Sequence, residues 1–376
     1  MSSMTDKERK SGNMEKIPFS QDEMTEPAGV QPGFPGAPDR TLWQAPISPR
    51  ENVLAAVLNK ECLYMPNARD VTSVNVSILP DNKARATVME GGEMFVPNPE
   101  GEQDVFGVTW IYDPAINGSM VRPGAPLLDD VENWKDVIKF PDVDSWDWEG
   151  AAKRTEEYRS DEQFAYMSTI FTGFFERLIS FMDFEEAAIA MIDEDSQPYV
   201  IELFERLADL YIDYVEHFKK YLDIDIVEMH DDWGSQQGLL ISEDVLRKVV
   251  YPSMKRVVDR VHELGMGFQL HSCGKIGKEL VPMMIDMGID VWMGQDINDK
   301  APLVAQYGDK IILQVECPEL GMDASEEEVK AAAQQFADDF IIEGKPAMFS
   351  IYACTIANPP QFTDEVYRIS RQTYAG

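Results

Sequence analysis

Short apolar runs alternate with long amphipathic stretches from about residue 164 to the end of the chain. Two of the stretches, residues 197–222 and 242–265, repeat apolar positions with the period of a helix. Strands and helices alternating at this spacing predict parallel strands joined by right-handed crossovers. The number of runs favours an α/β fold of the (β/α)8 TIM barrel type over an open sheet. The runs are residues 164–171, 225–234, 267–274, 289–296, 310–318 and 347–355.

The pattern before residue 164 is different. Residues 1–45 are polar and rich in Pro and Gly, which indicates an arm that is flexible or lies over a neighbouring surface. Ser48 and Pro49 are typical of a helix start, and we expect the folded part of the chain to begin there. Residues 65–150 form short alternating runs split by Gly, Pro and Asn, which predict a β-rich cap of hairpins and loops. We therefore expect a single barrel domain over residues 46–376.

Several apolar runs end in polar residues, and in a barrel all these strand ends open on one face. Strand alternation places His271 and Cys273 on the same wall of the predicted barrel mouth. A third ligand must come from another strand, and alternation favours Cys354 over Cys317. Imidazole and thiolate groups select zinc, with one position left open in a catalytic site. The alternative is a buried histidine beside two inert buried thiols.

Two acidic residues near this mouth are catalytic candidates, Glu228 and Asp231. Glu228 could be a further zinc ligand or a partner of His271, since either role needs a carboxylate near the ion. In the alternative interpretation Glu228 is solvated, and Asp232 and Ser242 cap the helices that follow.

Charge and cysteine content narrow the classes of function. The chain has 67 acidic and 33 basic residues, a formal net charge of -34, which excludes nucleic acid and anionic membrane as main partners. No apolar run is long enough to span a bilayer. Four cysteines in a long chain without an apolar leader favour reduced thiols and a cytoplasmic location. A homodimer is compatible with this composition.

Two segments carry a family resemblance. "LHSCG" and the later "CTIANPP" resemble the His-x-Cys-Gly and Cys-Gly-x-Ala-Pro segments of the zinc-dependent corrinoid methyltransferases, in the uroporphyrinogen decarboxylase-like superfamily. The resemblance runs from about residue 164 to the C-terminus. It implies a barrel with zinc at its mouth, held by His271, Cys273 and Cys354. The Arg-rich segment that binds porphyrinogen carboxylates in the decarboxylases has no counterpart.

The resemblance also implies a methyl transfer to or from a corrinoid. The chain has no cobalamin-binding Asp-x-His-x-x-Gly segment, so cobalamin must arrive on a partner corrinoid protein. Aromatic residues near strand ends predict an apolar pocket and hence O-demethylation of a methoxylated aromatic donor. The alternatives are methylcobalamin:thiol transfer, a decarboxylase-like lyase without metal, and a binding protein. The pocket candidates are Trp110, Tyr112, Phe171, Trp233 and Trp292, with Phe174 and Phe175 beside them.

Overall fold

The computed structural model describes residues 14–33, 38–115, 118–351 and 358–374. These residues divide into two compact units. The first unit comprises Ser73–Glu162 and Tyr166–Ile289, and the second comprises the described parts of Met4–Thr72, Gln163–Ala165 and Asp290–Gly376. Both units contain parallel strands with helices between them. The prediction of an α/β fold on parallel strands is confirmed, and small antiparallel sheets are added to it.

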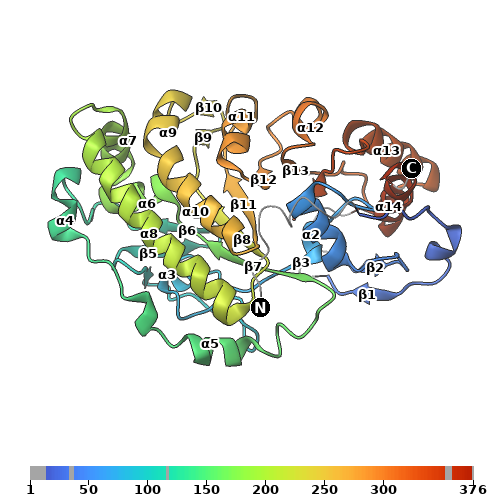
Figure 1. The fold of residues 1–376 in the computed structure, drawn as a ribbon, viewed down its shortest axis with the longest axis horizontal. Coiled ribbons are helices and arrows are strands. Elements are labelled where there is room, and N and C mark those ends of the chain that lie inside the picture. Colours follow the sequence, from blue (N-terminus) through green and yellow to red (C-terminus); the bar gives the residue numbers. More distant parts are fainter. Residues whose placement is uncertain (1–13, 34–37, 116–117, 352–357, 375–376) are drawn as a thin grey trace. The chain divides into compact units, whose positions relative to one another are not determined.

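Three parallel strands form the centre of the first unit: β7 (Ala165–Ile170), β8 (Ile226–His230) and β11 (Gly267–Ser272). Strand β8 lies between β7 and β11. Figure 1 shows the long helices α8 and α10 side by side over these strands. The remaining elements are α3 (Pro80–Ala84), α4 (Trp134–Val137), α5 (Trp148–Thr155), α6 (Phe174–Met182), α7 (Phe184–Ile192), α8 (Gln197–Leu222), β9 (Gly234–Ser235), β10 (Gly238–Leu239), α9 (Glu243–Val249), α10 (Tyr251–Glu263) and α11 (Gly277–Met287).

Helix α8 illustrates why the sequence forms these elements. Pro198 lies in its first turn, and its buried residues follow the helical period over the whole length. The helix ends at Asp223, which adopts the left-handed conformation that stops a helix. The predicted stretch 197–222 is confirmed to the residue. The second predicted stretch is divided into α9 and α10, and Ser242 caps α9 as one interpretation proposed.

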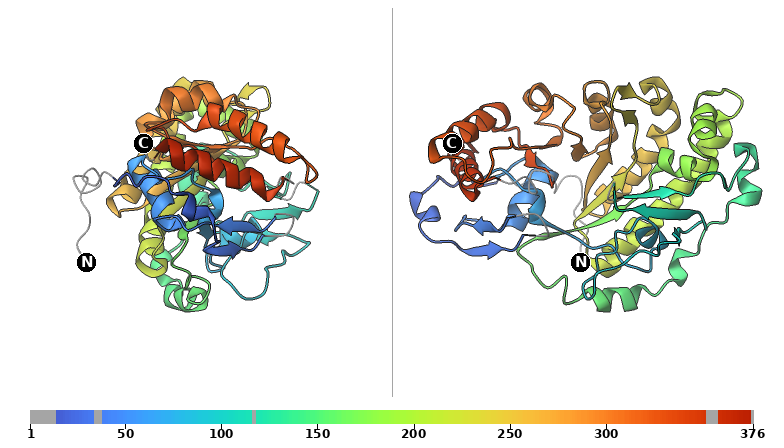
Figure 2. Two further views of the ribbon diagram at one scale, coloured as in Figure 1. Left: turned by 90° about the vertical axis from the view of Figure 1, so that its right-hand side faces the viewer. Right: turned by 180° about the vertical axis from the view of Figure 1, so that it is seen from behind.

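The region predicted as a cap contains one antiparallel meander, which Figure 2 shows from behind. It consists of β4 (Glu102–Gln103), β5 (Thr109–Asp113) and β6 (Gly118–Val121). Residues 80–84, in the region expected to form hairpins and loops, instead form helix α3, because Pro80 starts a helical turn.

The second unit contains the parallel strands β12 (Val291–Gly294), β13 (Ile312–Val315) and β14 (Met348–Phe349). Helices α13 and α14 pack against each other. Ser48 and Ser325 start α2 and α13 with capping boxes, which confirms the predicted start after Ser48. The other elements are β1 (Gly29–Gln31), β2 (Arg40–Leu42), α2 (Pro49–Asn59), β3 (Val71–Ser73), α12 (Lys300–Tyr307), α13 (Glu326–Phe340) and α14 (Pro360–Tyr374).

Buried arginines bind the described part of the predicted arm. Arg69 donates hydrogen bonds to the carbonyl oxygens of Gln31, Pro32 and Pro38. Arg371 pairs with the carboxylate of Glu23 at 2.7 Å. Residues 14–33 and 38–45 are therefore held against their own unit. Among all described residues, every helix is too short or too polar to cross a bilayer.

Candidate metal centre

The polar residues of β8 and β11 face each other in register. In this parallel pair His230 lies beside His271, and Glu228 lies beside Gln269. Thr169 of β7 is in register with Glu228 on its other side. Because side chains alternate along a strand, these residues project from the same side of the sheet, with the histidines nearer the strand ends. The predicted gathering of polar side chains at strand ends is present in this unit.

Three donor groups converge just beyond these strands. One oxygen, nitrogen or sulfur atom from each of Asp232, His271 and Cys273 lies within 4.8 Å of the others. Nε2 of His271 is 3.3 Å from Sγ of Cys273 and 4.0 Å from Oδ1 of Asp232. Asp232 follows β8, and its Oδ1 accepts a hydrogen bond of 2.7 Å from the backbone N–H of Cys273. Asp232 therefore joins the ends of the two strands.

The neutral imidazole of His271 suits a metal ion, whereas the Cys273 thiol must lose its proton when a metal binds. Burial, followed by the neighbouring His230, lowers the pKa of His271 to about 4, so its imidazole is neutral at pH 7. Burial and the carboxylate of Asp232 raise the pKa of the Cys273 thiol. Nδ1 of His271 is buried without a hydrogen-bond partner in the described part of the chain. Imidazole, sulfur and carboxylate are all zinc donors, so these residues fit that ion.

The loop that carries Cys273 depends on two glycines. Gly274 has a φ of +94°, a conformation that side chains rarely adopt. A Cβ at Gly274 would collide with the backbone of Gly234. Contact between these two glycines therefore lets the loop after β11 pass close to the loop after β8, where Asp232 lies.

Glu228 lies one layer below the donor groups and is almost fully buried. It accepts hydrogen bonds from His230 at 2.9 Å, from Thr169 at 3.3 Å, and from the Gln269 amide. Burial would raise its pKa, but the bonds from His230 and Gln269 and the nearby histidines outweigh burial and lower it. Glu228 therefore orients His230, whose ring packs on that of His271 at 4.4 Å between centroids.

Asp231 is fully buried and forms hydrogen bonds with neighbouring parts of the first unit. Its two oxygens accept hydrogen bonds from the backbone N–H of Glu176, in the first turn of α6, and from the indole N–H of Trp233. Burial raises the pKa of Asp231 to about 7. Its carboxylate therefore ties α6 and Trp233 to the end of β8.

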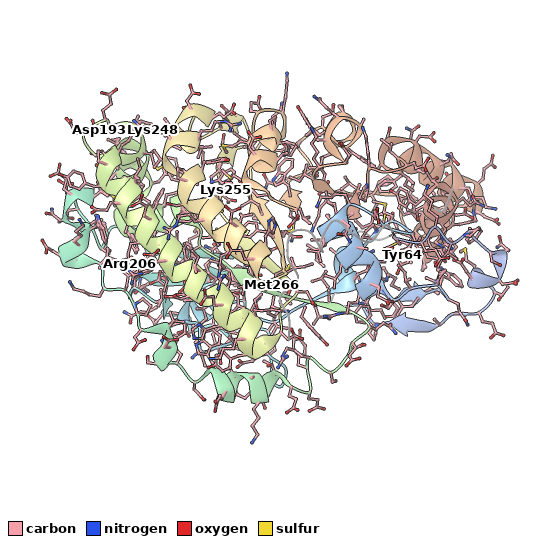
Figure 3. All side chains as sticks on the ribbon, in the orientation of Figure 1. Tyr64, Asp193, Arg206, Lys248, Lys255 and Met266 are labelled. Atoms are coloured by element: carbon pink, nitrogen blue, oxygen red, sulfur yellow. The ribbon has the colours of Figure 1, made fainter. Side chains whose placement is uncertain are left out.

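One basic residue near this cluster was not identified as a site residue from the sequence. The Arg85 guanidinium lies 3.3 Å from Glu176, and stacks 4.7 Å from the ring centre of Trp110. Its charge acts on both His271 and Cys273. Nothing in "NKARATV" marks Arg85, because the fold brings it from the predicted cap. By contrast, Arg206, Lys248 and Lys255 project from the outer helices α8, α9 and α10 in Figure 3.

The predicted pocket residues occupy different environments. Phe171 packs edge-on against His230, with 5.0 Å between the ring centroids. The indole N–H of Trp110 donates a hydrogen bond to Asp104, and Arg85 stacks on the Trp110 ring. Tyr112 is half-buried on β5, while Trp233, Phe174 and Phe175 are fully buried in the first unit. Trp292 is fully buried in the second unit. Cys354, the predicted third ligand, lies outside the described residues, and β14 ends at Phe349.

Comparisons with known proteins bear on the family and the fold. Residues 177–356 match the family model described as Uroporphyrinogen decarboxylase (URO-D). A methyltransferase from Methanosarcina mazei shares the fold, with a TM-score of 0.52 and 14% identity over 88% of this chain and 98% of that one.

A xylose isomerase-like TIM barrel protein from Mycobacterium smegmatis matches less well. Its TM-score is 0.30 at 10% identity, and the match covers 60% of this chain and 79% of that one. No curated protein matches the chain.

Proposed function

Since residues 177–356 match the family model described as Uroporphyrinogen decarboxylase (URO-D), we propose that the chain is a zinc-dependent methyltransferase. It moves a methyl group between a small substrate and the cobalt of a corrinoid carried by a second protein, in the cytoplasm. The observation that carries the proposal is the convergence of Asp232, His271 and Cys273 within 4.8 Å. The fold shared with the Methanosarcina mazei methyltransferase supports it.

Methyl transfer explains the described residues better than porphyrinogen decarboxylation does. A substrate with several carboxylates needs several free cations, yet the guanidinium of Arg69, in a segment that substitutes poorly for the Arg-rich one, is bound to carbonyl oxygens of the arm. A sulfur and imidazole donor set instead suits an ion that accepts one further sulfur or oxygen ligand. A zinc ion there would supply Lewis acidity toward a substrate thiol or ether oxygen.

Each described residue has a defined part in this proposal. His271 and Cys273 hold the ion, and Cys354 is the third ligand that the resemblance implies. Asp232 fixes the Cys273 loop through the 2.7 Å hydrogen bond to its backbone N–H. His230, oriented by Glu228, packs on the His271 ring and limits its rotation. Asp231 is a positioning residue, since its carboxylate is engaged by α6 and Trp233.

The proposed methyl donor is a methoxylated aromatic compound. The ring of Phe171 against His230 offers an apolar contact beside the donor groups. Arg85 stacks on Trp110 and pairs with Glu176 at 3.3 Å, and a donor with a carboxylate on its ring would compete with Glu176 for this cation. The same cation would serve an anionic thiol in the reverse reaction, so the two directions must be tested together.

The test mixes zinc-loaded protein with cob(I)alamin and methyl donors, and follows the cobalt spectrum. The donor panel pairs methoxybenzoates with the matching methoxybenzenes, and methylcobalamin with thiols tests the reverse direction. We expect conversion to methylcobalamin with a methoxylated aromatic, and loss of conversion in Cys273→Ser. Cys62→Ser is the matched control, because Cys62 belongs to the second unit. Zinc-loaded protein that reacts with no donor and no acceptor would refute the proposal.

A further inference from the structure

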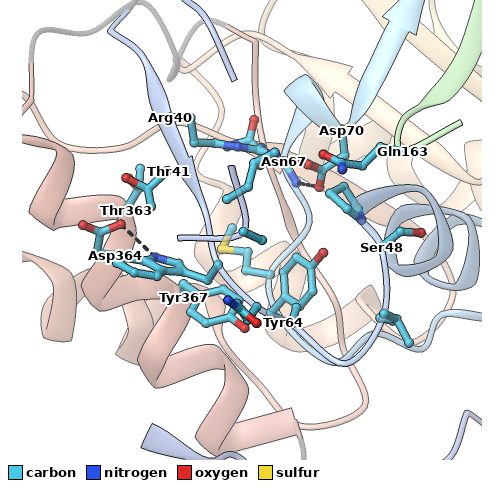
Figure 4. A pocket seen from close by; sticks show the side chains of 18 of the residues that line it. Arg40, Thr41, Ser48, Tyr64, Asn67, Asp70, Gln163, Thr363, Asp364 and Tyr367 are labelled. Carbon is cyan, nitrogen blue, oxygen red and sulfur yellow. Dashed lines mark hydrogen bonds and ion pairs between the residues drawn. The ribbon is translucent and has the colours of Figure 1, made fainter. Parts of the chain in front are cut away.

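The second unit contains a cavity of about 420 Å³ that shares no residue with the candidate metal centre. Its wall comes from β2 and the segment after it, from the start of α2, and from the first turns of α14, as Figure 4 shows. This volume is in the range of small-molecule sites. All its lining residues belong to the second unit.

Four aromatic side chains line this cavity: three are Trp43, Tyr64 and Tyr367, and the fourth is Phe349. The rings of Tyr64 and Tyr367 are 5.2 Å apart at an angle of 54°, so they form two inclined walls. The indole N–H of Trp43 donates a 3.0 Å hydrogen bond to Oδ1 of Asp364, and this bond fixes the third ring (Figure 4). Aromatic faces carry negative charge density and attract cations.

The charged residues of the lining are one arginine and three carboxylates. Arg40 is neutralised by Asp70 at 2.5 Å, and Glu51 is occupied by the Ser48 cap of α2. Asp364 accepts the hydrogen bond from Trp43, and no described basic side chain forms an ion pair with it. Burial, the largest cause, raises the pKa of Asp364 to about 6, as expected for a carboxylate without a counter-ion.

We propose that this cavity binds a small organic cation, an ammonium group with apolar substituents, between Asp364 and the rings of Trp43, Tyr64 and Tyr367. The carboxylate supplies the opposite charge, and the rings supply cation–π attraction and apolar contact. An anion is disfavoured, because the single arginine is already paired and the chain has a formal net charge of -34. This site is independent of methyl transfer at the metal centre.

The first test is titration calorimetry of the full chain with three probes of one shape. Choline is compared with its uncharged isostere, in which carbon replaces the ammonium nitrogen, and with the anion tert-butylacetate. We expect choline to bind about tenfold more tightly than the uncharged isostere, as cation–π and carboxylate contacts predict. Equal binding of the two, preference for tert-butylacetate, or no binding of choline would overturn the proposal.

A second test locates the binding in the cavity. The NMR signal of the Trp43 indole N–H, assigned with Trp43→Phe, should shift when choline is added to the wild-type protein. Asp364→Asn should weaken choline binding about tenfold, while Asp338→Asn, on the exposed face of α13, should leave it unchanged. An unmoved Trp43 signal overturns the assignment even if Asp364→Asn does not fold. Unchanged affinity in folded Asp364→Asn does so too.

Discussion

Nε2 of His271 lies 3.3 Å from Sγ of Cys273, two residues further along the chain. The strand ends at Ser272, and the loop that follows turns the thiol back toward the imidazole. Asp232, from the end of the neighbouring strand, fixes this turn through the backbone N–H of Cys273. Two adjacent strand ends therefore produce one donor cluster.

This geometry predicts that zinc content depends on both residues. His271→Ala and Cys273→Ser should each weaken zinc binding by at least about 100-fold, because each removes a direct donor. Inductively coupled plasma mass spectrometry after dialysis against a competing chelator measures the effect. Cys62→Ser should retain the wild-type zinc content, since Cys62 lies in the second unit. Full zinc retention in both site variants would contradict the assignment.

Glu228 should contribute to stability as well as to the site. Glu228→Ala removes the shared carboxylate acceptor of the buried Thr169 and Gln269 and of the half-buried His230. We expect a loss of roughly 2 to 4 kcal/mol in the free energy of unfolding, the scale for a broken buried polar cluster. Urea unfolding of zinc-free protein measures it without a contribution from metal binding. A loss below about 0.5 kcal/mol, typical of surface changes, would show that water replaces the carboxylate.

The sequence predicts these strands well because apolar periodicity and strand alternation are local properties. The helix at 197–222 and the position of His271 near the end of its strand follow from such local patterns. Arg85 and Asp232 could not be identified as site residues in this way. Arg85 reaches the cluster from a region whose folding is decided by long-range contacts, and Asp232 resembles an ordinary helix cap in sequence. The role of Cys354 stays a prediction, because it lies outside the described residues.

A buried ion cluster in the first unit gives a further prediction. Arg177 is 1% exposed and pairs with Asp81 and, at 2.6 Å, with Asp104. Arg177→Met should cost about 3 to 5 kcal/mol of unfolding free energy, because two carboxylates then lose their buried counter-ion.

Urea unfolding again measures the loss. Combining Arg177→Met with Asp81→Asn and Asp104→Asn should recover part of it, because the unpaired charges are removed. Arg206→Met on α8, which is half-exposed, should change stability by less than about 0.5 kcal/mol. An Arg177→Met loss no larger than this control would mean that the cluster is not coupled to folding.

Asp364 predicts a pH dependence of stability in the second unit. Its folded pKa of about 6 exceeds the ordinary value of 3.8, mainly through burial, so the folded state binds more protons between these values. Its contribution to stability is therefore greatest below about pH 4 and declines as pH rises to about 6. Because Asp364 is partly exposed, we expect the decline to be about 1 to 2 kcal/mol.

Asp364→Asn removes this titration but not the shape of the side chain. The difference in unfolding free energy between wild type and Asp364→Asn, measured from pH 4 to pH 7, should therefore shift against the wild type and level off above about pH 6. Subtracting the two profiles cancels the other carboxylates that titrate in the same range. A difference that is constant with pH would show that Asp364 is solvated in the folded protein. A difference that grows in favour of the wild type would show that a cation already pairs with it.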